Sequence, residues 1–336
     1  MILVWIQFAI CVLLIVLFGA KLSRYGDIIA EKTGMSGIWV GLLLLAAVTS
    51  LPELITGIGA VTLVGGREGA NLALGAVFGS NLFNLLIIAL MDTVYRYGPL
   101  LSGASRGHVL VAALSILAIA FAGGSILLGN RVWNGAIGWV SIYSVVLVLL
   151  YLWGSRKVFK RERHQPEART PQYEGASRRR AYWGFIIAAL VIIGAGTWLA
   201  YIGDEIVAGT GWDATFVGSL FLAATTSMPE LVVCIAALRI GATDMAIANI
   251  LGSNIFNMGI VIAGDDLFYR SGSIFSSASS GHVFSAAIAV LMTLIVIAGL
   301  VFRPRRRMPL RMSYYTVALI AIYLGGAYAL FTAPWK

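Results

Sequence analysis

Apolar runs of about 20 residues recur from one end of the chain to the other, and this pattern restricts the fold more than any other feature. Of the 336 residues, 59% are hydrophobic and only 12% are charged, with a mean hydropathy of +0.89. A helix needs about 20 predominantly apolar residues to cross the hydrocarbon core of a bilayer. We therefore predict an all-α polytopic membrane protein. Its ten transmembrane helices are expected near residues 2–22, 37–64, 69–92, 107–129, 132–153, 182–202, 214–239, 243–265, 281–302 and 313–333.

Cysteine content and the N-terminal run argue against two other classes of protein. Cys11 and Cys234 are the only cysteines and both lie in apolar spans, so neither a disulfide framework nor a thiolate metal cluster is predicted. The run 1–20 has no basic residue before it and no clear cleavage site, and Lys21 and Arg24 follow it. We interpret it as a retained first span rather than a removed signal peptide.

Basic residues concentrate on one side of the predicted topology. Ten spans place both termini on the same side, and 20 of the 24 Lys and Arg residues then fall on the opposite side, nine of them in the linker 154–181. Cytoplasmic loops carry the excess of Lys and Arg in membrane proteins. We therefore expect a plasma (cell inner) membrane protein with N- and C-termini outside and the linker 154–181 in the cytoplasm. This topology explains the net charge of +9 without a nucleic-acid partner.

Two halves of the chain carry the same polar blocks in the same order. Gly26-Asp27 matches Gly203-Asp204 at an offset of 177. The other matches, at offsets of 173 to 177, are Gly34 with Gly211, Glu53 with Glu230, Gly79–Asn84 with Gly252–Asn257, and Ser102–Val109 with Ser276–Val283. Residues 1–153 and 182–336 are therefore predicted to be two five-helix repeats. Because five is odd, the second repeat is inverted about an axis in the membrane plane.

Each half places a proline and a glutamate inside an apolar run, as Pro52-Glu53 and as Pro229-Glu230. A mid-helix proline removes a hydrogen bond and clashes with the carbonyl four residues back, so we expect a broken helix at both places. A carboxylate inside a membrane span is costly and marks a functional site by default. Inversion brings the two broken helices together at a midplane ion site, where two carboxylates match the charge of one Ca²⁺.

Hydroxyl and amide side chains around these carboxylates are candidate ligands. Hard oxygen donors suit Ca²⁺ or Na⁺ rather than softer metals. In membrane helices, Ser, Thr and Asn also bond to a neighbouring helix or to their own backbone, and this structural interpretation stays open for each of them. The candidates are Thr49, Ser50, Thr226 and Ser227 beside the prolines, and Ser80, Asn84, Ser253 and Asn257 in the Gly-Ser-Asn blocks.

Other polar residues in the spans are predicted to be structural. Asn81 and Asn254 lie on a different helix face from the candidate ligands, and we expect them to pack helices together. Five residues near span ends are expected to be solvated at the membrane interface or to cap helices: Asp92, Asp265, Asp266, His108 and His282. A proton relay through the two histidines is the alternative.

The blocks resemble the α-repeats of the calcium/cation antiporter superfamily, whose best-known branch is the sodium/calcium exchangers. The matching blocks are Thr49–Glu53 and Thr226–Glu230, followed by Gly79–Asn84 and Gly252–Asn257, and the resemblance covers essentially the whole chain. It implies a secondary active antiporter that exchanges Ca²⁺ for Na⁺ across the membrane by alternating access. Ca²⁺ and Na⁺ are then transported ions, and neither a cofactor nor a protein partner is expected.

The resemblance also implies a role for each matched residue. The two glutamates match carboxylates that bridge the Ca²⁺ and Na⁺ sites, and the hydroxyls and amides match polar ligands. Ala46 and Ala223 match positions that offer backbone carbonyls. The implied metal ligands are Glu53, Glu230, Thr49, Thr226, Ser50, Ser227, Ser80, Asn84, Ser253, Asn257, Ala46 and Ala223.

This chain departs from the family pattern at several positions. Val48 and Thr225 stand where glycine usually precedes Thr-Ser, and Asn257 stands where potassium-dependent branches carry an aspartate. Potassium co-transport is therefore not expected. The linker is also too short for the large cytosolic regulatory domain of animal exchangers, so calcium sensing of that type is not expected either.

Three alternative functions remain to be compared with Na⁺/Ca²⁺ exchange. A proton-coupled Ca²⁺/cation antiporter would use Glu53 and Glu230 to carry protons. A membrane enzyme is not expected, because the chain has no His-Glu-x-x-His motif and its histidines, His108, His164 and His282, are dispersed. A passive channel would conduct without a counter-ion, which electrical recording distinguishes.

Overall fold

The computed structural model describes residues 1–131, 135–163, 172–211, 216–304, 306, 308 and 312–333, without the side chains of 130, 131 and 216–219. The first residues of the predicted spans 132–153 and 214–239 lie outside these ranges. The following residues, which the sequence predictions used, also lie outside them: His164, Arg169, Arg305, Arg307, Arg311 and Lys336.

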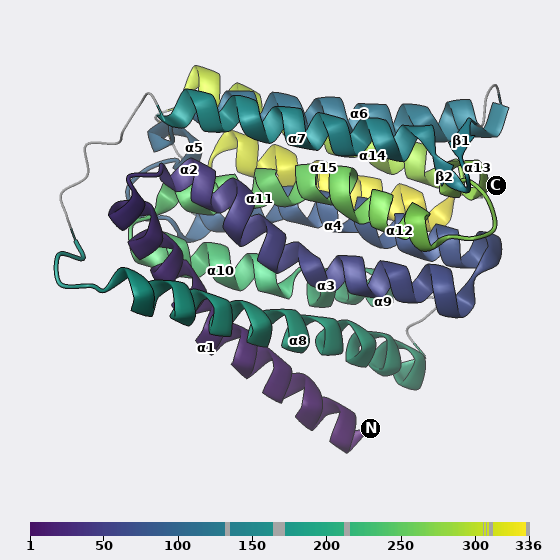
Figure 1. The fold of residues 1–336 in the computed structure, drawn as a ribbon, viewed down its shortest axis with the longest axis horizontal. Helices are drawn as coiled ribbons and strands as arrows, with labels where there is room; N and C mark the ends of the chain where they lie inside the picture. Colours follow the sequence, from purple (N-terminus) through teal and green to yellow (C-terminus); the bar gives the residue numbers. More distant parts are fainter. Residues whose placement is uncertain are drawn as a thin grey trace.

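The described chain is almost entirely helical (Figure 1). The α-helices are α1 (Ile2–Thr33), α2 (Gly37–Trp39), α3 (Ala46–Gly59), α4 (Gly66–Val94), α5 (Leu100–Gly103), α6 (Gly107–Arg131), α7 (Ile142–Arg163), α8 (Arg178–Thr210), α9 (Phe216–Thr226), α10 (Met228–Arg239), α11 (Thr243–Phe256), α12 (Ile262–Phe268), α13 (Ile274–Ser277), α14 (Gly281–Phe302) and α15 (Tyr314–Thr332). Three π-helical segments are η1 (Val40–Leu45), η2 (Ala60–Val64) and η3 (Asn257–Val261). A two-residue hairpin pairs β1 (Ala136–Ile137) with β2 (Val140–Ser141).

Ten membrane spans follow from these elements. Within the described residues, nine helices are long and apolar enough to cross a bilayer, and the bent pair α9–α10 makes a tenth. Two of the nine are composite, because α2, η1, α3 and η2 run together as 37–64, and α11, η3 and α12 run together as 243–268. The predicted ten-span, all-α fold is confirmed.

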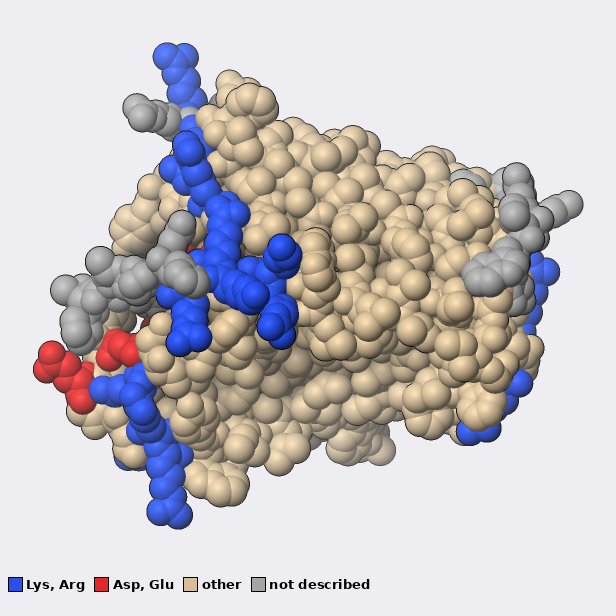
Figure 2. All heavy atoms as spheres, turned by 45° about the horizontal axis from the view of Figure 1, so that its top comes forward, with Lys and Arg blue, Asp and Glu red and all other residues tan. Residues whose placement is uncertain are grey.

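The two ends of the bundle differ in charge. Figure 1 places both chain termini at one end, and the connection from α7 to α8 at the other. Figure 2 shows Lys and Arg side chains gathered mainly at the end that carries this linker. We call these ends the termini face and the linker face.

Several predicted boundaries are corrected. The fifth span is α7, Ile142–Arg163, rather than 132–153, because the hairpin precedes it and its apolar stretch continues into basic residues. Helix α1 extends to Thr33, a full three turns beyond the predicted end. Helices α7 and α8 also extend into the predicted linker 154–181, so the connection between them starts after Arg163 and ends before Arg178.

Matched glycines end the first helix of each repeat. Gly34 follows α1 with φ 71°, and Gly211 follows α8 with φ 73°. This left-handed conformation is accessible to glycine at no steric cost and commonly terminates helices. The repeat detected in the sequence therefore sets the same backbone turn in both halves.

Asp92 is a buried anchor rather than a solvated interfacial residue. Its carboxylate accepts hydrogen bonds from the backbone of Leu100 and Ser313, at 2.7 and 3.0 Å, and from the hydroxyls of Tyr315 and Thr316, at 2.7 and 2.6 Å. It is fully buried. The prediction of interfacial solvation was wrong because these partners come from loops and from the far end of the chain.

Asp266 repeats this anchor in the second half. It accepts from the backbone of Ile274 and Ser141, at 3.0 and 2.7 Å, and from the Ser144 hydroxyl at 2.7 Å. Each repeat thus uses one carboxylate to fasten its own short helix, α5 or α13, and the start of the last span of the other repeat. The equivalence of these contacts shows that the repeats are inverted and interlocked.

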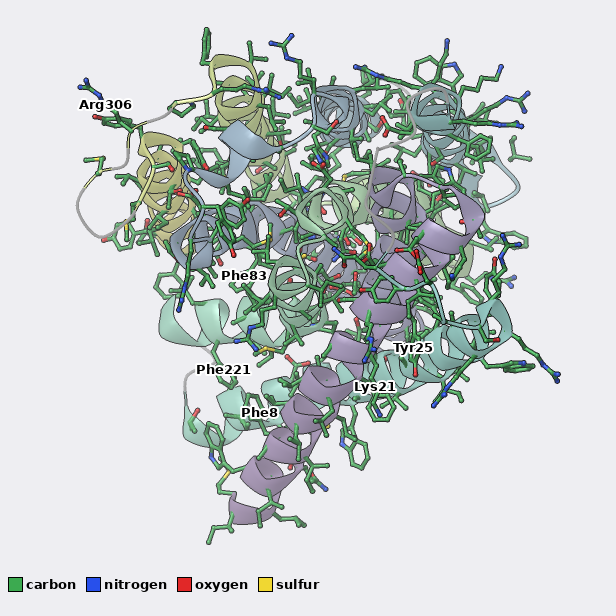
Figure 3. All side chains as sticks on the ribbon, turned by 90° about the vertical axis from the view of Figure 1, so that its left-hand side faces the viewer. Phe8, Lys21, Tyr25, Phe83, Phe221 and Arg306 are labelled. Carbon is green, nitrogen blue, oxygen red and sulfur yellow. The ribbon has the colours of Figure 1, made fainter. Side chains whose placement is uncertain are left out.

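The third and eighth spans form the centre of the bundle. Helices α4 and α11 are the most buried of the spans, whereas α1 lies at the periphery and packs along α8. Figure 3, which looks onto the linker face, shows α1 crossing the outside of the bundle, with Phe8 beside Phe221 of α9. Their rings stack at 5.7 Å between centroids. Most polar residues in the middle of α4 and α11 are consequently buried, among them Ser80, Asn84, Ser253 and Asn257.

Candidate ion site

The first proline–glutamate pair lies in a helix that remains continuous. Helix α3 passes through Pro52, and the span 37–64 has no sharp bend. The predicted break at Pro52 is therefore corrected. The irregular backbone lies instead about two turns away on each side, in the π-helical segments η1 and η2 that flank α3.

The second pair lies at a true break. Helices α9 and α10 meet at Ser227 with a bend of 59° between them, and Pro229 and Glu230 fall in the first turn of α10. Proline is tolerated in a first turn because its missing N–H has no helical partner there. The two halves of the site are thus related in sequence but differ in backbone conformation: the first helix is continuous and the second is bent.

A single glycine brings the two prolines together. A side-chain carbon at Gly196 of α8 would lie 2.9 Å from the Pro52 ring and 3.1 Å from the Pro229 ring. Both contacts are shorter than van der Waals distance, so only glycine leaves room for both rings. The glutamates that follow the two prolines are consequently held in the same region of the bundle.

The two carboxylates point into one buried polar cluster. Ser80 donates to Glu53 Oε1 and Ser50 donates to Glu230 Oε1, both at 3.3 Å. Ser227 donates to Ser80 at 3.4 Å and connects the halves. Both glutamates are almost completely buried, yet Oε2 of each has no hydrogen-bond partner among the described residues. A buried carboxylate oxygen without a donor requires another positive partner.

Amide side chains complete the cluster. Asn84 donates to Asn254 Oδ1 at 3.0 Å, and Asn257 donates to Asn81 Oδ1 at 3.0 Å and to Ser80 at 3.3 Å. The predicted packing role of Asn81 and Asn254 is confirmed, because they join α4 to α11. Oδ1 of Asn84 and of Asn257 is buried and has no partner in the described part of the chain. Four acceptor oxygens, two from carboxylates and two from amides, are therefore left for a cation.

The two candidate threonines next to the cluster, Thr49 and Thr226, have different hydrogen-bond partners. Thr49 is 3.4 Å from Ser253 and donates toward the Ala46 carbonyl at 3.4 Å. Thr226 bonds within its own helix, to the Ala223 carbonyl at 3.2 Å and to the Leu222 carbonyl at 3.1 Å. Sequence reasoning missed Asn249, whose Oδ1 lies 3.5 Å from the Thr49 hydroxyl. Its repeat counterpart is alanine, so the repeat comparison gave no signal there.

A cavity leads to the cluster from one face. A cavity of about 510 Å³ lies between the ends of the second and sixth spans and the start of the third, which places its mouth at the termini face. Ser80, Ala223 and Thr226 line it. The cavity therefore connects the termini face with Ser80 of the polar cluster.

The corresponding route from the linker face is closed. The repeat counterparts of Thr226, Gly57, Gly75 and Ser80, which line the cavity, are fully buried; they are Thr49, Cys234, Ala248 and Ser253. Gly252 lies directly against the backbone of Leu42, whereas its counterpart Gly79 borders the cavity and meets nothing. In the part of the chain that the structure describes, the cluster is therefore open toward the termini face and packed toward the linker face.

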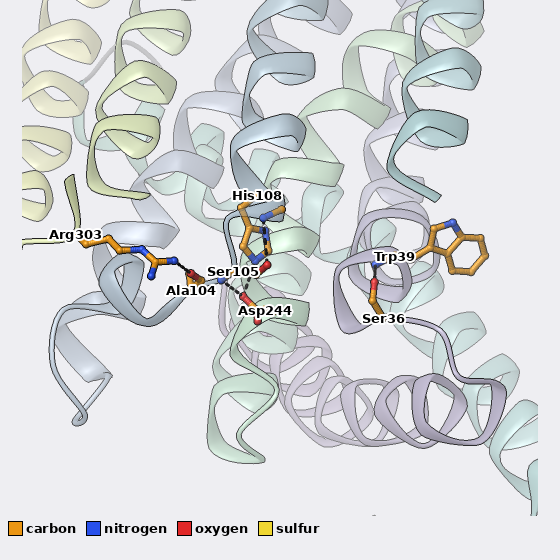
Figure 4. A network of polar contacts seen from close by, with 8 residues as sticks. Ser36, Trp39, Ala104, Ser105, His108, Asp244 and Arg303 are labelled. Atoms are coloured by element: carbon orange, nitrogen blue, oxygen red, sulfur yellow. Dashed lines mark hydrogen bonds and ion pairs between the residues drawn. The ribbon is translucent and has the colours of Figure 1, made fainter. Parts of the chain in front are cut away.

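An interhelical hydrogen bond joins α6 to α11 at the linker face (Figure 4). Asp244 Oδ1 lies 2.7 Å from His108 Nε2 and accepts from the Ser105 backbone at 2.8 Å. At the other face Asn71 takes the place of Asp244, 3.0 Å from His282 Nε2. Both histidines lie at helix starts near span ends, as predicted, but the expected solvation is corrected for His108, which is fully buried. Each histidine contacts the start of a central helix.

The sequence profile of the sodium/calcium exchanger protein family matches residues 3–153 and 180–332, which is most of the chain. The chain belongs to this family. The family is one of transporters, which agrees with the expectation that the chain is not an enzyme. The chain is consequently a multi-pass integral membrane protein of the cation antiporter class.

Curated relatives and solved structures agree with this assignment. The exchanger is 28% identical to the inner membrane protein YrbG of Escherichia coli, covering 74% of this chain and 75% of the relative. It is 24% identical to the sodium/calcium exchanger MaX1 of Methanosarcina acetivorans, covering 88% and 92%. The solved structure of the sodium-calcium exchanger NCX_Mj matches with a TM-score of 0.74 and 20% identity over 99% of both chains, which establishes the shared fold.

Proposed function

We propose that this exchanger moves Ca²⁺ in one direction and Na⁺ in the other by alternating access. The observation that carries the proposal is the convergence of Glu53 and Glu230 from inverted repeats, each with one buried carboxylate oxygen that no described residue hydrogen-bonds. Two carboxylates neutralise one divalent cation. Several Na⁺ ions competing for the same oxygens would exclude Ca²⁺, and this competition couples the two fluxes.

The proposed ligands are hard oxygen atoms. Ca²⁺ takes six to eight of them at about 2.3–2.6 Å, which two carboxylates, amide carbonyls, hydroxyls and backbone carbonyls together supply. We assign ligand roles to Glu53, Glu230, Thr49, Thr226, Ser50, Ser227, Ser80, Asn84, Ser253, Asn257, Ala46 and Ala223. Ca²⁺ and Na⁺ are cargo in this proposal rather than resident cofactors.

Alternating access follows from the inverted repeats. A cavity lined by both repeats is open at the termini face, while the repeat counterparts of several of its lining residues are buried toward the linker face. Exchanging the roles of the two repeats would close the first route and open the second around a fixed ion site. In this proposal, the open surroundings of Gly79 and the packed surroundings of Gly252 represent the open and closed states between which each repeat alternates.

We also propose the inner membrane, with both termini outside and the linker in the cytoplasm. The concentration of Lys and Arg at the linker face supports this orientation. The name of the Escherichia coli relative, an inner membrane protein, supports the location. Fusion of a periplasmic reporter enzyme to the C-terminus should give active reporter; an inactive reporter would reverse the assignment.

Counter-ion-resolved flux tests the function. Purified protein in liposomes loaded with Na⁺ should take up ⁴⁵Ca²⁺ when external Na⁺ is replaced by choline, and uptake should stop when the Na⁺ gradient is abolished. Uptake that instead follows an imposed proton gradient and ignores Na⁺ would establish the proton-coupled alternative. Replacing K⁺ by choline should change nothing, because Asn257 stands where a potassium-dependent site would carry an acid. Some relatives are named sodium/potassium/calcium exchangers, but they match only about a third to a half of this chain.

A further inference from the structure

Asp204 of α8 lines the cavity that leads to the ion site. Among the described residues, it is the one charged side chain in the wall of the 510 Å³ cavity, which otherwise consists of apolar and uncharged polar residues. No basic side chain of the described residues borders the cavity. Asp204 lies six residues before the end of α8, so its carboxylate is at the mouth, while Ser80 and Thr226 lie at the inner end.

The surroundings of Asp204 leave its carboxylate free. The residue is exposed, and it has no hydrogen bond or ion pair with any described residue. An ionisable side chain within a membrane span normally faces a water-filled cavity and marks an ion pathway. An unneutralised carboxylate at the mouth of a low-dielectric cleft raises the local concentration of cations.

The repeat counterpart of Asp204 marks the closed face. Gly26-Asp27 on α1 matches Gly203-Asp204 on α8. Asp27 is 5% exposed, and the Tyr173 hydroxyl from the α7–α8 connection donates to its Oδ2 at 3.1 Å. Each repeat therefore contributes one aspartate at the same place relative to the ion site. The aspartate at the open face is free, and the aspartate at the closed face is covered.

We propose that Asp204 is the cation-capture residue of the open face: it draws Ca²⁺ into the cavity and sets the apparent Ca²⁺ affinity from the termini side. It does not belong to the ligand set of the central site. This proposal rests on the proposed Ca²⁺/Na⁺ exchange, because the ion that it collects is the transported one. It identifies a residue that sets affinity on one face only.

The primary test compares two neighbouring charge removals. Asp204→Asn should raise the half-saturating concentration of ⁴⁵Ca²⁺ at the termini face by on the order of ten-fold at low ionic strength, with the maximal rate unchanged. The increase should shrink at high salt, because the screening length falls from about 30 Å at 0.01 M to about 10 Å at 0.1 M. Glu205→Gln removes an exposed carboxylate one residue away that does not line the cavity, and it should behave as wild type.

Charge rescue separates capture from a structural effect. Asp204→Cys should show the same loss, a methanethiosulfonate reagent carrying a sulfonate should restore affinity, and one carrying a trimethylammonium should not. Cys11 and Cys234 are buried and leave position 204 as the reactive site. Equal shifts in Asp204→Asn and Glu205→Gln, a loss of maximal rate alone, or no rescue by the sulfonate would overturn the proposal.

The outcomes also separate this proposal from the function on which it rests. A wild-type protein without Na⁺-driven ⁴⁵Ca²⁺ flux contradicts the proposed function. In that case Asp204 cannot be a Ca²⁺-capture residue either. Rapid labelling of the Asp204→Cys variant would still show that the cavity is open to solvent. Normal wild-type flux with an unaltered Asp204→Asn variant contradicts the capture proposal alone.

Discussion

Replacing either central glutamate by glutamine should abolish high-affinity Ca²⁺ binding. Glu53→Gln and Glu230→Gln keep the size of the side chain and one carbonyl oxygen, so packing beside the prolines is retained. They remove one of the two negative charges that face the proposed ion. Each glutamate receives one serine hydroxyl at 3.3 Å and keeps a second oxygen without a partner, so the charge available for a cation is lost outright.

The expected magnitude follows from the burial of both groups. Removing one partner of a buried charge pair costs about 3–5 kcal/mol. At about 1.4 kcal/mol per factor of ten, the dissociation constant for Ca²⁺ rises by roughly 150- to 3,500-fold. A ligand at 100 times its dissociation constant stabilises a protein by about 2.7 kcal/mol. The same Ca²⁺ concentration should stabilise either variant by about 0.3 kcal/mol or less.

Thermal unfolding of purified protein with and without Ca²⁺ measures this difference without a transport assay. Glu68→Gln, which neutralises an exposed carboxylate in the first turn of α4, is the matched control and should keep the full Ca²⁺-dependent shift. A Glu53→Gln or Glu230→Gln protein that keeps the wild-type shift would refute the assignment of these carboxylates to the ion site.

Three further predictions address the framework of the site. Asp92→Asn should lower the free energy of unfolding, measured by chemical denaturation, by about 3–5 kcal/mol. The new amide NH₂ group would face at least two of the four groups that donate hydrogen bonds to the carboxylate. A change below about 1 kcal/mol would contradict the anchoring role of Asp92. Gly196→Ala should lower the midpoint of thermal unfolding, because the added methyl meets both proline rings, whereas Gly194→Ala, with nothing within 4 Å, should not; equal effects would argue against the close approach. Burial, followed by the nearby Asp27 carboxylate, raises the pKa of Tyr173 from 10.0 to about 12, so its docking stabilises the fold below pH 10 and is lost as the pH rises toward 12. Tyrosinate absorbance should therefore lack one late-titrating group in Tyr173→Phe, and an unchanged titration would contradict that contact.

The ten spans and the repeat were predictable because their signals are local or periodic. A run of apolar residues sets each helix, and matched blocks such as Gly34 and Gly211 impose the same turn twice. The convergence of the Pro-Glu pairs followed from inversion alone. These inferences needed no knowledge of which side chains touch.

The failures have a common physical cause, which is dependence on distant contacts. Asp92 and Asp266 looked interfacial because each is near a span end, but their partners lie up to 224 positions away in sequence or come from connecting loops. The break at Pro52 was expected from the missing N–H alone. In the fold, flanking π-helical segments accommodate that proline without a bend, while Ser227 takes the whole bend of the second repeat.

The position of a bound divalent ion tests the central claim most directly. Anomalous diffraction from crystals soaked with Ca²⁺ or its heavier analogue Sr²⁺ would locate the ion independently of any flux. We predict one divalent ion between Glu53 and Glu230, at about 2.3–2.6 Å from a carboxylate oxygen of each, and its loss on soaking with excess Na⁺. An ion bound elsewhere, or one that touches only a single glutamate and persists in Na⁺, would contradict the account.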